Sequence, residues 1–520
     1  MKSAAGSGAP RATSSFETMS VSELAMQQAA SAAEQATAPS KRPPDKGRSM
    51  SIAPRKLSAA NVAMVTAAWG AVSSDATPRT SLKFDSQSSS ASMGSSLVVN
   101  QRAMRDVQHV AQGAPGADYE LLEVIGKGGM GVVYSARQAS VDRIVAVKMI
   151  RPKAAADQQR REKFLSEAVV TGDLDHPNIV PIYELGSNEE NALFYSMKRV
   201  QGTPWGDCIA EKSLAENLEI LMKVSDAVAF AHSNGVIHRD LKPENIMLGD
   251  FGEVLVMDWG LALATSAFRH ADFVSTTENM GGTPAYMAPE MVTGPFESIG
   301  PASDIYLLGA LLYEVVSGLR PHHGETAQAC LMAAARNEIQ LCEQTGELID
   351  IAYRALSTEP ADRHASVQEF QTAIREYHSH TESAALSTRA DQELAQAKKT
   401  GDYQSFAHAV FGFEEAHALW TGNTRARAGI SEARLAYASC AEQKGDFELG
   451  VSLLEADDPT HAPLRAALLA AQREREARQK WLTRFKRIAA AMVMIVFGVI
   501  TASLVVVSRA KNQEAAAKEQ

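Results

Sequence analysis

The sequence predicts an α+β chain, in which a strand-rich lobe is followed by a helix-rich lobe, a further helical region and one membrane-spanning helix. Three observations support this class. Runs of β-branched residues of strand length begin near Tyr119. Apolar residues recur mostly at helical spacing from Leu214 to about Tyr377. The stretch from Ile488 to Ser508 contains no charged residue. The chain has 520 residues, so at roughly 150 residues per domain we expect about three to four structural units.

Composition and charge exclude several classes of protein. Lys and Arg number 51 and Asp and Glu 61, a net charge of -10, so no excess of positive charge favours nucleic acid as a partner. A hydrophobic content of 45% argues against a wholly disordered or fibrous chain. The cysteines are far apart and form no CxxC pair, which disfavours a disulfide framework or structural zinc and fits a reducing compartment. They are Cys208, Cys330, Cys342 and Cys440.

Residues 1–117 are predicted to form a disordered extension. Ser, Ala, Gly, Thr and Gln dominate this stretch, and its only aromatic residues are Phe16, Trp69 and Phe84. Such a composition cannot build a core. The start has no apolar run of signal-peptide length, so we expect the extension to be cytosolic. A short helix around Val62–Val72 is the alternative to a flexible tail.

A glycine-rich loop joins the first two predicted strands. The strand runs are Leu121–Ile125, Val132–Tyr134 and Ile144–Ile150, and the sequence GKGGMG fills positions 126–131 between the first two. Because this loop precedes a strand rather than a helix, its backbone N–H groups can fold over nucleotide phosphates without side-chain obstruction. Lys148 lies in the third run, 17 positions after Gly131, and is placed to reach α- and β-phosphates.

Two later segments carry oxygen ligands and a second lysine. The run VIHRDLKPEN at 236–245 puts Asp240 and Asn245 five positions apart in an irregular loop, with Lys242 between them. The run VLVMDWG at 254–260 places Asp258 at the end of an apolar strand. Phosphoryl transfer needs Mg²⁺ held by hard oxygen atoms, a carboxylate that orients the attacking hydroxyl, and a lysine that balances phosphate charge. Each motif alone could be a surface loop, but together and in this order they predict phosphoryl transfer.

From about Asp118 to Tyr377, half of the chain, these motifs resemble eukaryotic-type (Hanks-type) serine/threonine protein kinases, most closely the membrane-anchored bacterial kinases. The resemblance implies a bilobal protein kinase fold over 118–378, with a β-rich N-lobe and an α-helical C-lobe. It implies ATP and Mg²⁺ as cofactors and the Ser or Thr residues of proteins as acceptors, as in a non-specific serine/threonine protein kinase. Residues implied to contact ATP are Gly126, Lys127, Gly128, Gly129, Gly131, Val133, Lys148, Met197 and Val200.

The resemblance also assigns roles to the charged residues. Lys148 is expected to pair with Glu167, the ion pair of the active state. Asp240 is implied to be the catalytic base, and Lys242 to stabilise the transferred phosphoryl group. Asn245 and Asp258 are implied to bind Mg²⁺. Met197 resembles the gatekeeper before a hinge at 198–200.

The segment GTPAYMAPE at 282–290 resembles the substrate-binding end of an activation segment. The resemblance implies that Glu290 pairs with Arg363, that Asp304 anchors the catalytic loop from below, and that Thr283 contacts Asp240 and Lys242. Together with Lys242, the Gly282-Thr283 pair resembles the serine/threonine class rather than the tyrosine class. Phosphorylation is expected on the residues before this segment, where a phosphate could pair with Arg239; they are Ser275, Thr276 and Thr277.

Two residues depart from the family pattern. Trp259 stands where the family usually has Phe, and Thr171 stands where a larger apolar residue commonly stacks. Trp can fill an apolar slot and donate one hydrogen bond, so we expect altered regulation rather than lost catalysis.

Two other functions are alternatives to an active protein kinase: a pseudokinase scaffold that only binds partners, and a small-molecule phosphotransferase of similar fold. The intact charged residues disfavour the first, and the peptide-binding segment up to Glu290 disfavours the second.

Residues 382–480 are rich in strong helix formers. Two phrases there resemble each other, KTGDY at 399–403 and KGDF at 444–447, and each has the form of a turn between paired helices. This is similar to tetratricopeptide repeats, although the spacing of 44 between Gly401 and Gly445 exceeds the usual value of about 34. An unrelated helical hairpin or a coiled stalk is the alternative. The region is expected to bind protein partners or to dimerise.

The 21 uncharged residues 488–508 would span about 31 Å as a helix, which matches the hydrocarbon core of a membrane. Basic residues are more numerous before this stretch than after it, so the kinase is expected in the cytoplasm of a single-pass protein of the bacterial inner membrane, with 509–520 as a short extracytoplasmic tail. They are Arg473, Arg475, Arg478, Lys480, Arg484, Lys486 and Arg487 before the stretch, and Arg509, Lys511 and Lys518 after it.

Overall fold

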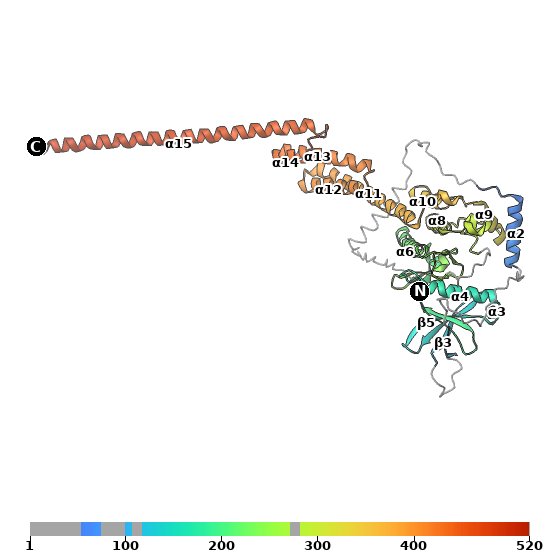
Figure 1. Ribbon diagram of the computed structural model, residues 1–520. Coiled ribbons are helices and arrows are strands. Elements are labelled where there is room, and N and C mark those ends of the chain that lie inside the picture. The colour runs from blue at the N-terminus through green and yellow to red at the C-terminus, as the bar shows by residue number, and fades with distance from the viewer. Residues whose placement is uncertain (1–53, 74–98, 107–116, 271–280, 519–520) are drawn as a thin grey trace, which may run out of the picture. The chain divides into compact units, whose positions relative to one another are not determined.

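The computed structural model describes residues 54–73, 99–106, 117–270 and 281–518, which divide between two compact units (Figure 1). One unit contains the described residues up to Tyr377, and the other begins at His378. The first unit holds a strand-rich lobe and a helix-rich lobe, as predicted, and the second is helical.

The strand-rich lobe is a seven-stranded sheet with the order β1-β6-β7-β5-β4-β3-β2. The five central strands pair antiparallel with one another: β3 (Tyr119–Lys127), β4 (Gly131–Gln138), β5 (Arg143–Ile150), β6 (Ile182–Ser187) and β7 (Leu193–Lys198). Helix α3 (Pro152–Ala155) and helix α4 (Gln158–Asp173) follow β5. Helix α4 begins where the side chain of Asp157 accepts hydrogen bonds from two backbone N–H groups. Its Phe164 and Ala168 pack against Ala146 and Met197 of the sheet.

The strands at the two edges of this sheet come from a segment that we predicted to be disordered. Strand β1 (Asn100–Gln101) pairs parallel with β6, and β2 (Met104–Asp106) pairs parallel with β3. Only two residues separate them, so one short segment reaches both edges. Arg102, between the two strands, pairs with Glu184 of β6 at 2.6 Å. The prediction was wrong here because strands of two and three residues are too short to show a periodic pattern.

Helix α2 (Ala59–Ser73) is a second ordered element of the extension. It contacts α7 (Pro289–Thr293) and α9 (Ala327–Arg336) of the helix-rich lobe. Val65 of α2 is fully buried in the main core of that lobe, and the Arg55 N–H donates to the Arg336 carbonyl at 2.7 Å. The flexible tail predicted over this stretch is therefore wrong, and the alternative of a short helix is right. The predictions for residues 1–53, 74–98 and 107–116 lie outside the described residues.

The helix-rich lobe is built around α6 (Leu214–Ser233) and α8 (Pro301–Ser317), which contact each other in the main hydrophobic core. Ser213 and Glu216 form a capping box that starts α6, and Gly318 ends α8 in the left-handed conformation. The other helices are α5 (Trp205–Cys208), α7, α9, α10 (Glu347–Ala355) and α11 (Val367–Thr400), with short 3-10 turns η2 (Pro243–Asn245), η4 (Phe296–Ser298) and η5 (Pro360–Asp362). Short strands complete the lobe: β8 (Gly202–Pro204), β9 (Val236–Ile237), β10 (Ile246–Gly249), β11 (Val254–Val256) and β12 (Leu263–Ala264).

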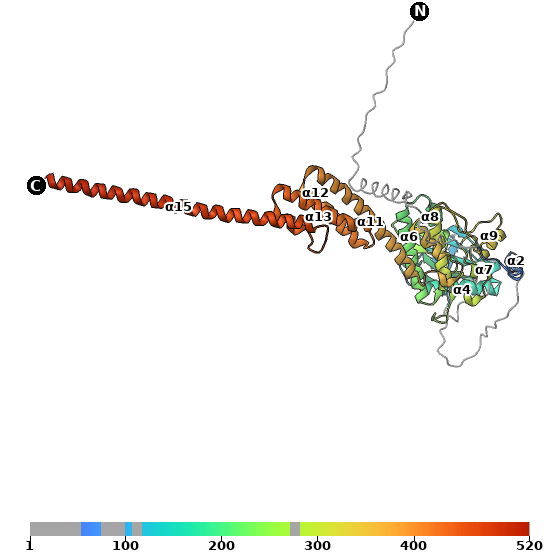
Figure 2. The same ribbon diagram turned by 90° about the horizontal axis from the view of Figure 1, so that it is seen from above.

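The second unit contains the end of α11, then α12 (Tyr403–Leu419), α13 (Thr424–Lys444), α14 (Phe447–Leu453) and α15 (Ala462–Lys518), and Figure 2 shows α11, α12 and α13 side by side. The two similar phrases form turns in which Gly401 and Gly445 have left-handed φ angles of 66° and 79°. These turns touch each other, because Lys444 donates to the Gly401 carbonyl at 2.6 Å and the Tyr403 hydroxyl donates to Asp446 at 2.8 Å. Successive helical hairpins thus stack at their turns; their classification as tetratricopeptide repeats stays a prediction.

Helix α15 is continuous over 57 residues. At its start, Leu468 is buried in a small cluster with Ala438 and Leu454. Farther along, the stretch 488–507 exposes its large apolar side chains. By length and composition, α15 is the one helix in the described part of the chain that is apolar enough to cross a membrane.

Candidate active site

The predicted ion pair joins the sheet to helix α4. Lys148 Nζ lies 2.6 and 2.8 Å from the two carboxylate oxygens of Glu167. The Tyr195 hydroxyl, from β7, donates to Glu167 Oε1 at 2.8 Å. Only 17% of the Lys148 side chain and 3% of that of Glu167 are exposed, so the pair is largely removed from water. Because Lys148 and Glu167 come from different elements, the pair fixes the position of α4 against β5.

Electrostatics keep Lys148 charged despite its burial. Burial alone would lower the pKa of Lys148, but the carboxylates of Glu167 and Asp258 outweigh it and raise this pKa above its ordinary value. The same attraction shows that Asp258 lies near Lys148. Lys148 therefore keeps the positive charge that a site for anionic phosphate requires.

The glycine-rich hairpin connects β3 and β4. The Gly128 N–H donates to the Gly131 carbonyl at 2.9 Å and closes the turn. A Cβ atom on Gly131 would lie 2.8 Å from the Met149 carbonyl of β5, whereas a Cβ on Gly129 would meet nothing within 4 Å. Glycine at 131 thus permits the close approach of β4 to β5. At the tip of the hairpin, no other atoms crowd the backbone of Gly129. Strand register then places Val133 opposite Lys148.

The loop at 236–245, which the family resemblance implies to be the catalytic loop, is held by Asp304, as predicted. This carboxylate is completely buried and accepts hydrogen bonds from the backbone N–H groups of His238 and Arg239 at 2.8 and 2.9 Å, and it contacts His232 Nε2 at 2.8 Å. Burial would raise the pKa of Asp304, but the interactions with His232 and the loop hold this pKa below its ordinary value. The anchored loop turns sharply, since Arg239 has a φ of 69°. This turn presents Asp240.

Asp240 is the centre of a hydrogen-bond network. Its Oδ1 accepts from the Thr283 hydroxyl at 2.9 Å, and its Oδ2 lies 3.2 Å from Lys242 Nζ. Lys242 also donates to Thr283 Oγ1 at 2.8 Å. The predicted contacts of Thr283 are therefore present. A hydroxyl that donates to Asp240 and accepts from Lys242 has the arrangement that an acceptor Ser or Thr needs.

Asn245 and Asp258 are the residues predicted to hold Mg²⁺. Asn245 donates its amide N–H groups to the Asp240 carbonyl at 2.8 Å and to Asp240 Oδ2 at 3.2 Å, which leaves Oδ1 as its ligand atom. Asp258 is exposed and has a φ of 56°. No cluster of three or more His, Cys, Asp or Glu side chains suited to a metal occurs among the described residues. One carboxylate and one amide oxygen nevertheless fit Mg²⁺, which keeps several waters and also binds substrate phosphates.

The segment at 282–290, which resembles the substrate-binding end of an activation segment, is fixed by a buried ion pair. Arg363 donates to both oxygens of Glu290, at 2.7 and 2.8 Å, as predicted. Ser303 donates to the same carboxylate at 2.8 Å. Gly282 has a φ of 125°, and a Cβ there would meet the Arg239 carbonyl at 3.2 Å. The candidate phosphorylation sites Ser275, Thr276 and Thr277 lie outside the described residues.

The two departures from the family pattern are both buried. Trp259 is 1% exposed, and its ring lies 4.5 Å from that of His238. It fills the apolar slot as expected, but its indole N–H is buried and has no hydrogen-bond partner among the described residues. The expected hydrogen bond is thus absent, at a cost of about 1–3 kcal/mol. Thr171 turns its hydroxyl back to the Glu167 carbonyl at 2.7 Å.

Two residues of the site, Tyr195 and Lys163, were not predicted from the sequence. Tyr195 orients Glu167, and no local pattern singles out a tyrosine inside an apolar strand. Lys163 lies one helical turn before Glu167; burial lowers its pKa, while the nearby carboxylates of Asp258 and Glu167 oppose this. The spacing of four residues from Glu167 was the available signal.

The fold and this site define a class of protein. The protein kinase domain family matches residues 119–380, half of the chain, and the chain belongs to this family. Relatives carry the name serine/threonine-protein kinase PknD. The one from Chlamydia trachomatis serovar D is 35% identical over 299 residues, covering 50% of this chain and 31% of the relative. Those from Chlamydia muridarum and Chlamydia caviae are 34% and 32% identical over 296 and 295 residues, covering 49% and 50% of this chain and 31% of each relative.

The chain thus spans about a third of the length of these relatives. The match confirms the resemblance to bacterial Hanks-type serine/threonine kinases.

Proposed function

We propose that this protein is an ATP-dependent serine/threonine protein kinase that transfers the γ-phosphate of ATP to Ser or Thr of proteins, autophosphorylates and signals from a membrane. The observation that carries the proposal is the network around Asp240. There Thr283, Lys242 and Asn245 converge on one carboxylate at 2.9–3.2 Å. A scaffold that only bound partners would have no physical need for this arrangement.

In the proposed reaction, Asp240 orients the acceptor hydroxyl and accepts its proton as the oxygen attacks the γ-phosphorus of ATP. The bond between this phosphorus and the oxygen that bridges it to the β-phosphate breaks, and ADP leaves. The hydroxyl replaces Thr283 or shares Asp240 with it. Lys242 lies between Asp240 and the incoming phosphoryl group and offsets the negative charge on its oxygens. Asn245 keeps the Asp240 carboxylate in place through its amide N–H groups.

Nucleotide binding is assigned to the strand-rich lobe. Lys148, held by Glu167, would contact the α- and β-phosphates, and the open backbone at 126–131 would cover them. Met197 and Val200 would lie beside the adenine. Asn245 and Asp258 would hold Mg²⁺, which when bound neutralises phosphate charge.

The apolar stretch of α15 is proposed to anchor the protein in the bacterial inner membrane, with the kinase domain in the cytoplasm. Seven basic residues from Arg473 to Arg487 precede this stretch and three follow it, which favours a cytoplasmic N-terminal side. A reporter that is active only in the cytoplasm should give signal before Met1 and none after Gln520. The reverse pattern would contradict this orientation.

The enzymatic proposal is tested with purified full-length protein in detergent and ATP labelled at the γ-phosphate. The wild type should label itself and a protein acceptor, but not small-molecule acceptors. Asp240→Asn should reduce the rate by at least about a hundredfold, because amide cannot accept the hydroxyl proton. Asp250→Asn, which alters an exposed carboxylate between β10 and β11, is the matched control. An equally active Asp240→Asn variant would reject the site, and a wild type without transfer to protein would reject the function.

A further inference from the structure

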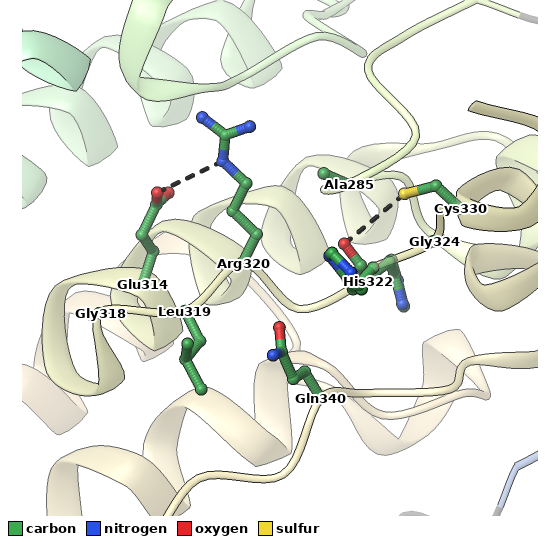
Figure 3. Close-up of a pocket in the computed structure, with 10 residues that line it drawn as sticks. Ala285, Glu314, Gly318, Leu319, Arg320, His322, Gly324, Cys330 and Gln340 are labelled. Carbon is green, nitrogen blue, oxygen red and sulfur yellow. Dashed lines mark hydrogen bonds and ion pairs between the residues drawn. The ribbon is translucent and has the colours of Figure 1, made fainter. Parts of the chain in front are cut away.

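A cluster of charges lies beside the end of the activation segment. Arg320 follows α8, and its guanidinium lies 3.2 Å from Glu244 and 3.6 Å from Glu314. Figure 3 shows Arg320 and Glu314 side by side and joined by a dashed line. Arg320 and Glu314 both line a cavity of about 500 Å³, which Ala285 also lines. Two carboxylates therefore share one guanidinium next to an open space.

This cluster is connected to the two segments that surround the proposed position of the acceptor hydroxyl, namely the loop with Asp240 and Lys242 and the segment with Thr283. Glu244 lies two residues after Lys242, in the 3-10 turn that ends the catalytic loop. Tyr286 donates its hydroxyl to Glu314 at 2.7 Å, and its backbone N–H donates to the Thr283 carbonyl at 3.0 Å. Since Thr283 contacts Asp240, the cluster is joined through Tyr286 on one side and through Glu244 on the other to the residues around the acceptor position.

The three charged groups differ in how firmly they are held. The Glu314 side chain is 12% exposed and fixed by Tyr286, whereas Arg320 and Glu244 are 53% and 45% exposed. An exposed ion pair of this kind contributes little to stability. Arg320 can therefore be removed without loss of the fold, and the two carboxylates would then face the peptide with no counter-charge.

We propose that Arg320 is a specificity-determining residue, which occupies in this chain the place between Glu244 and Glu314 that a basic side chain of a peptide substrate would otherwise take. An Arg or Lys near the acceptor residue of a peptide then does not raise its kcat/KM with the wild-type enzyme, which uses substrates with uncharged residues around the acceptor. Loss of Arg320 opens a site for a guanidinium or ammonium group. This inference rests on the proposed kinase function.

The test uses the full-length enzyme and a set of threonine peptides, in which a single Arg is moved through each position on either side of the acceptor. For each peptide, kcat/KM is compared with that of the Ala-flanked parent. In the wild type we expect every ratio to stay within about twofold, since no unpaired carboxylate awaits the charge. In Arg320→Ala we expect one position to improve by about tenfold, through a lower KM, because two carboxylates can now bind the Arg.

Further variants separate charge from structure. Arg320→Lys keeps the positive charge and should behave as the wild type. Adding Glu244→Gln to Arg320→Ala should remove most of the gain. Arg336→Ala breaks the similarly exposed pair between Arg336 and Glu338, at 3.4 Å, and should leave all ratios unchanged. Arg320→Gln removes the charge but keeps the aliphatic part of the side chain, and it replaces Arg320→Ala if that variant melts at a lower temperature.

An Arg320→Ala or Arg320→Gln enzyme with wild-type ratios would overturn the inference, and so would a wild type that already prefers Arg. Neither outcome would affect the proposed kinase function, because both require measurable transfer to the parent peptide. A wild type that phosphorylates no peptide and no protein would instead reject the function itself.

Discussion

His322 makes the stability of the helix-rich lobe depend on pH. The ring is 1% exposed, with Nδ1 at 3.0 Å from the Glu338 carbonyl and Nε2 at 2.8 Å from the Tyr306 hydroxyl. Burial lowers the pKa of His322 to about 4, and hydrogen bonds to the backbone offset this only in part. The neutral ring is therefore the form that the folded lobe accommodates.

The sign and size of the effect follow from this shift. In the unfolded chain His322 has a pKa of about 6.5, so between about pH 6.5 and pH 4 the unfolded state binds more protons than the folded state. The stabilising contribution is complete above that window and is lost as the pH falls through it. From pH 7 to pH 5, a folded pKa of about 4 corresponds to a loss of about 2 kcal/mol in the free energy of unfolding.

Urea unfolding of the wild type and of His322→Gln at pH 7 and pH 5, in detergent and followed by tryptophan fluorescence, measures this loss. The glutamine can keep a donor and an acceptor but cannot titrate, so the variant should lose about 2 kcal/mol less than the wild type over the same range. His323→Gln, at the exposed neighbouring position, should lose as much as the wild type. Equal losses in wild type and His322→Gln would refute the reasoning.

Three further changes test packing and charge in the kinase domain. Arg363→Ala leaves the buried Glu290 carboxylate unpaired and should lower the free energy of unfolding by about 3–5 kcal/mol. The control Arg354→Ala loses a surface pair with Glu369 and should lower it by less than about 1 kcal/mol. Thermal melts compare the two variants. Gly131→Ala places a Cβ 2.8 Å from the Met149 carbonyl and should destabilise the domain by about 1–3 kcal/mol, while Gly129→Ala should have little effect in the same melts. Val65→Asp buries a carboxylate where α2 packs, so limited proteolysis should cut residues 54–73 faster than in the wild type or in Met64→Asp, whose position is 46% exposed.

The catalytic loop and its partners could be predicted from sequence because their chemistry is tied to short fixed spacings. Asp240, Lys242 and Asn245 lie within six residues, so one loop brings them together. The partners from distant segments, such as Glu167 and Arg363, followed from the family resemblance. Local pattern alone does not contain those pairings.

The elements that were missed owe their order to tertiary contacts. Helix α2 has an Ala-rich composition that resembles a flexible tail, and only the burial of Val65 in the lobe core reveals why it is ordered. Strands β1 and β2 depend on the exposed edges of a sheet formed by later residues. The lack of a partner for the Trp259 indole N–H within the described part of the chain likewise depends on which groups surround the ring, which sequence does not specify.

Helix α15 has a mechanical consequence. Leu468 packs in the cluster with Ala438 and Leu454, and the uncharged stretch begins at Ile488 in the same uninterrupted helix, about 30 Å farther along. Because no loop separates the two, a rotation of the uncharged stretch about its own axis is passed to Leu468 as torque, with no hinge to absorb it. The number of residues between them sets their relative rotation: one residue inserted after Leu468 turns the uncharged stretch by about 100° relative to Leu468 and its neighbours.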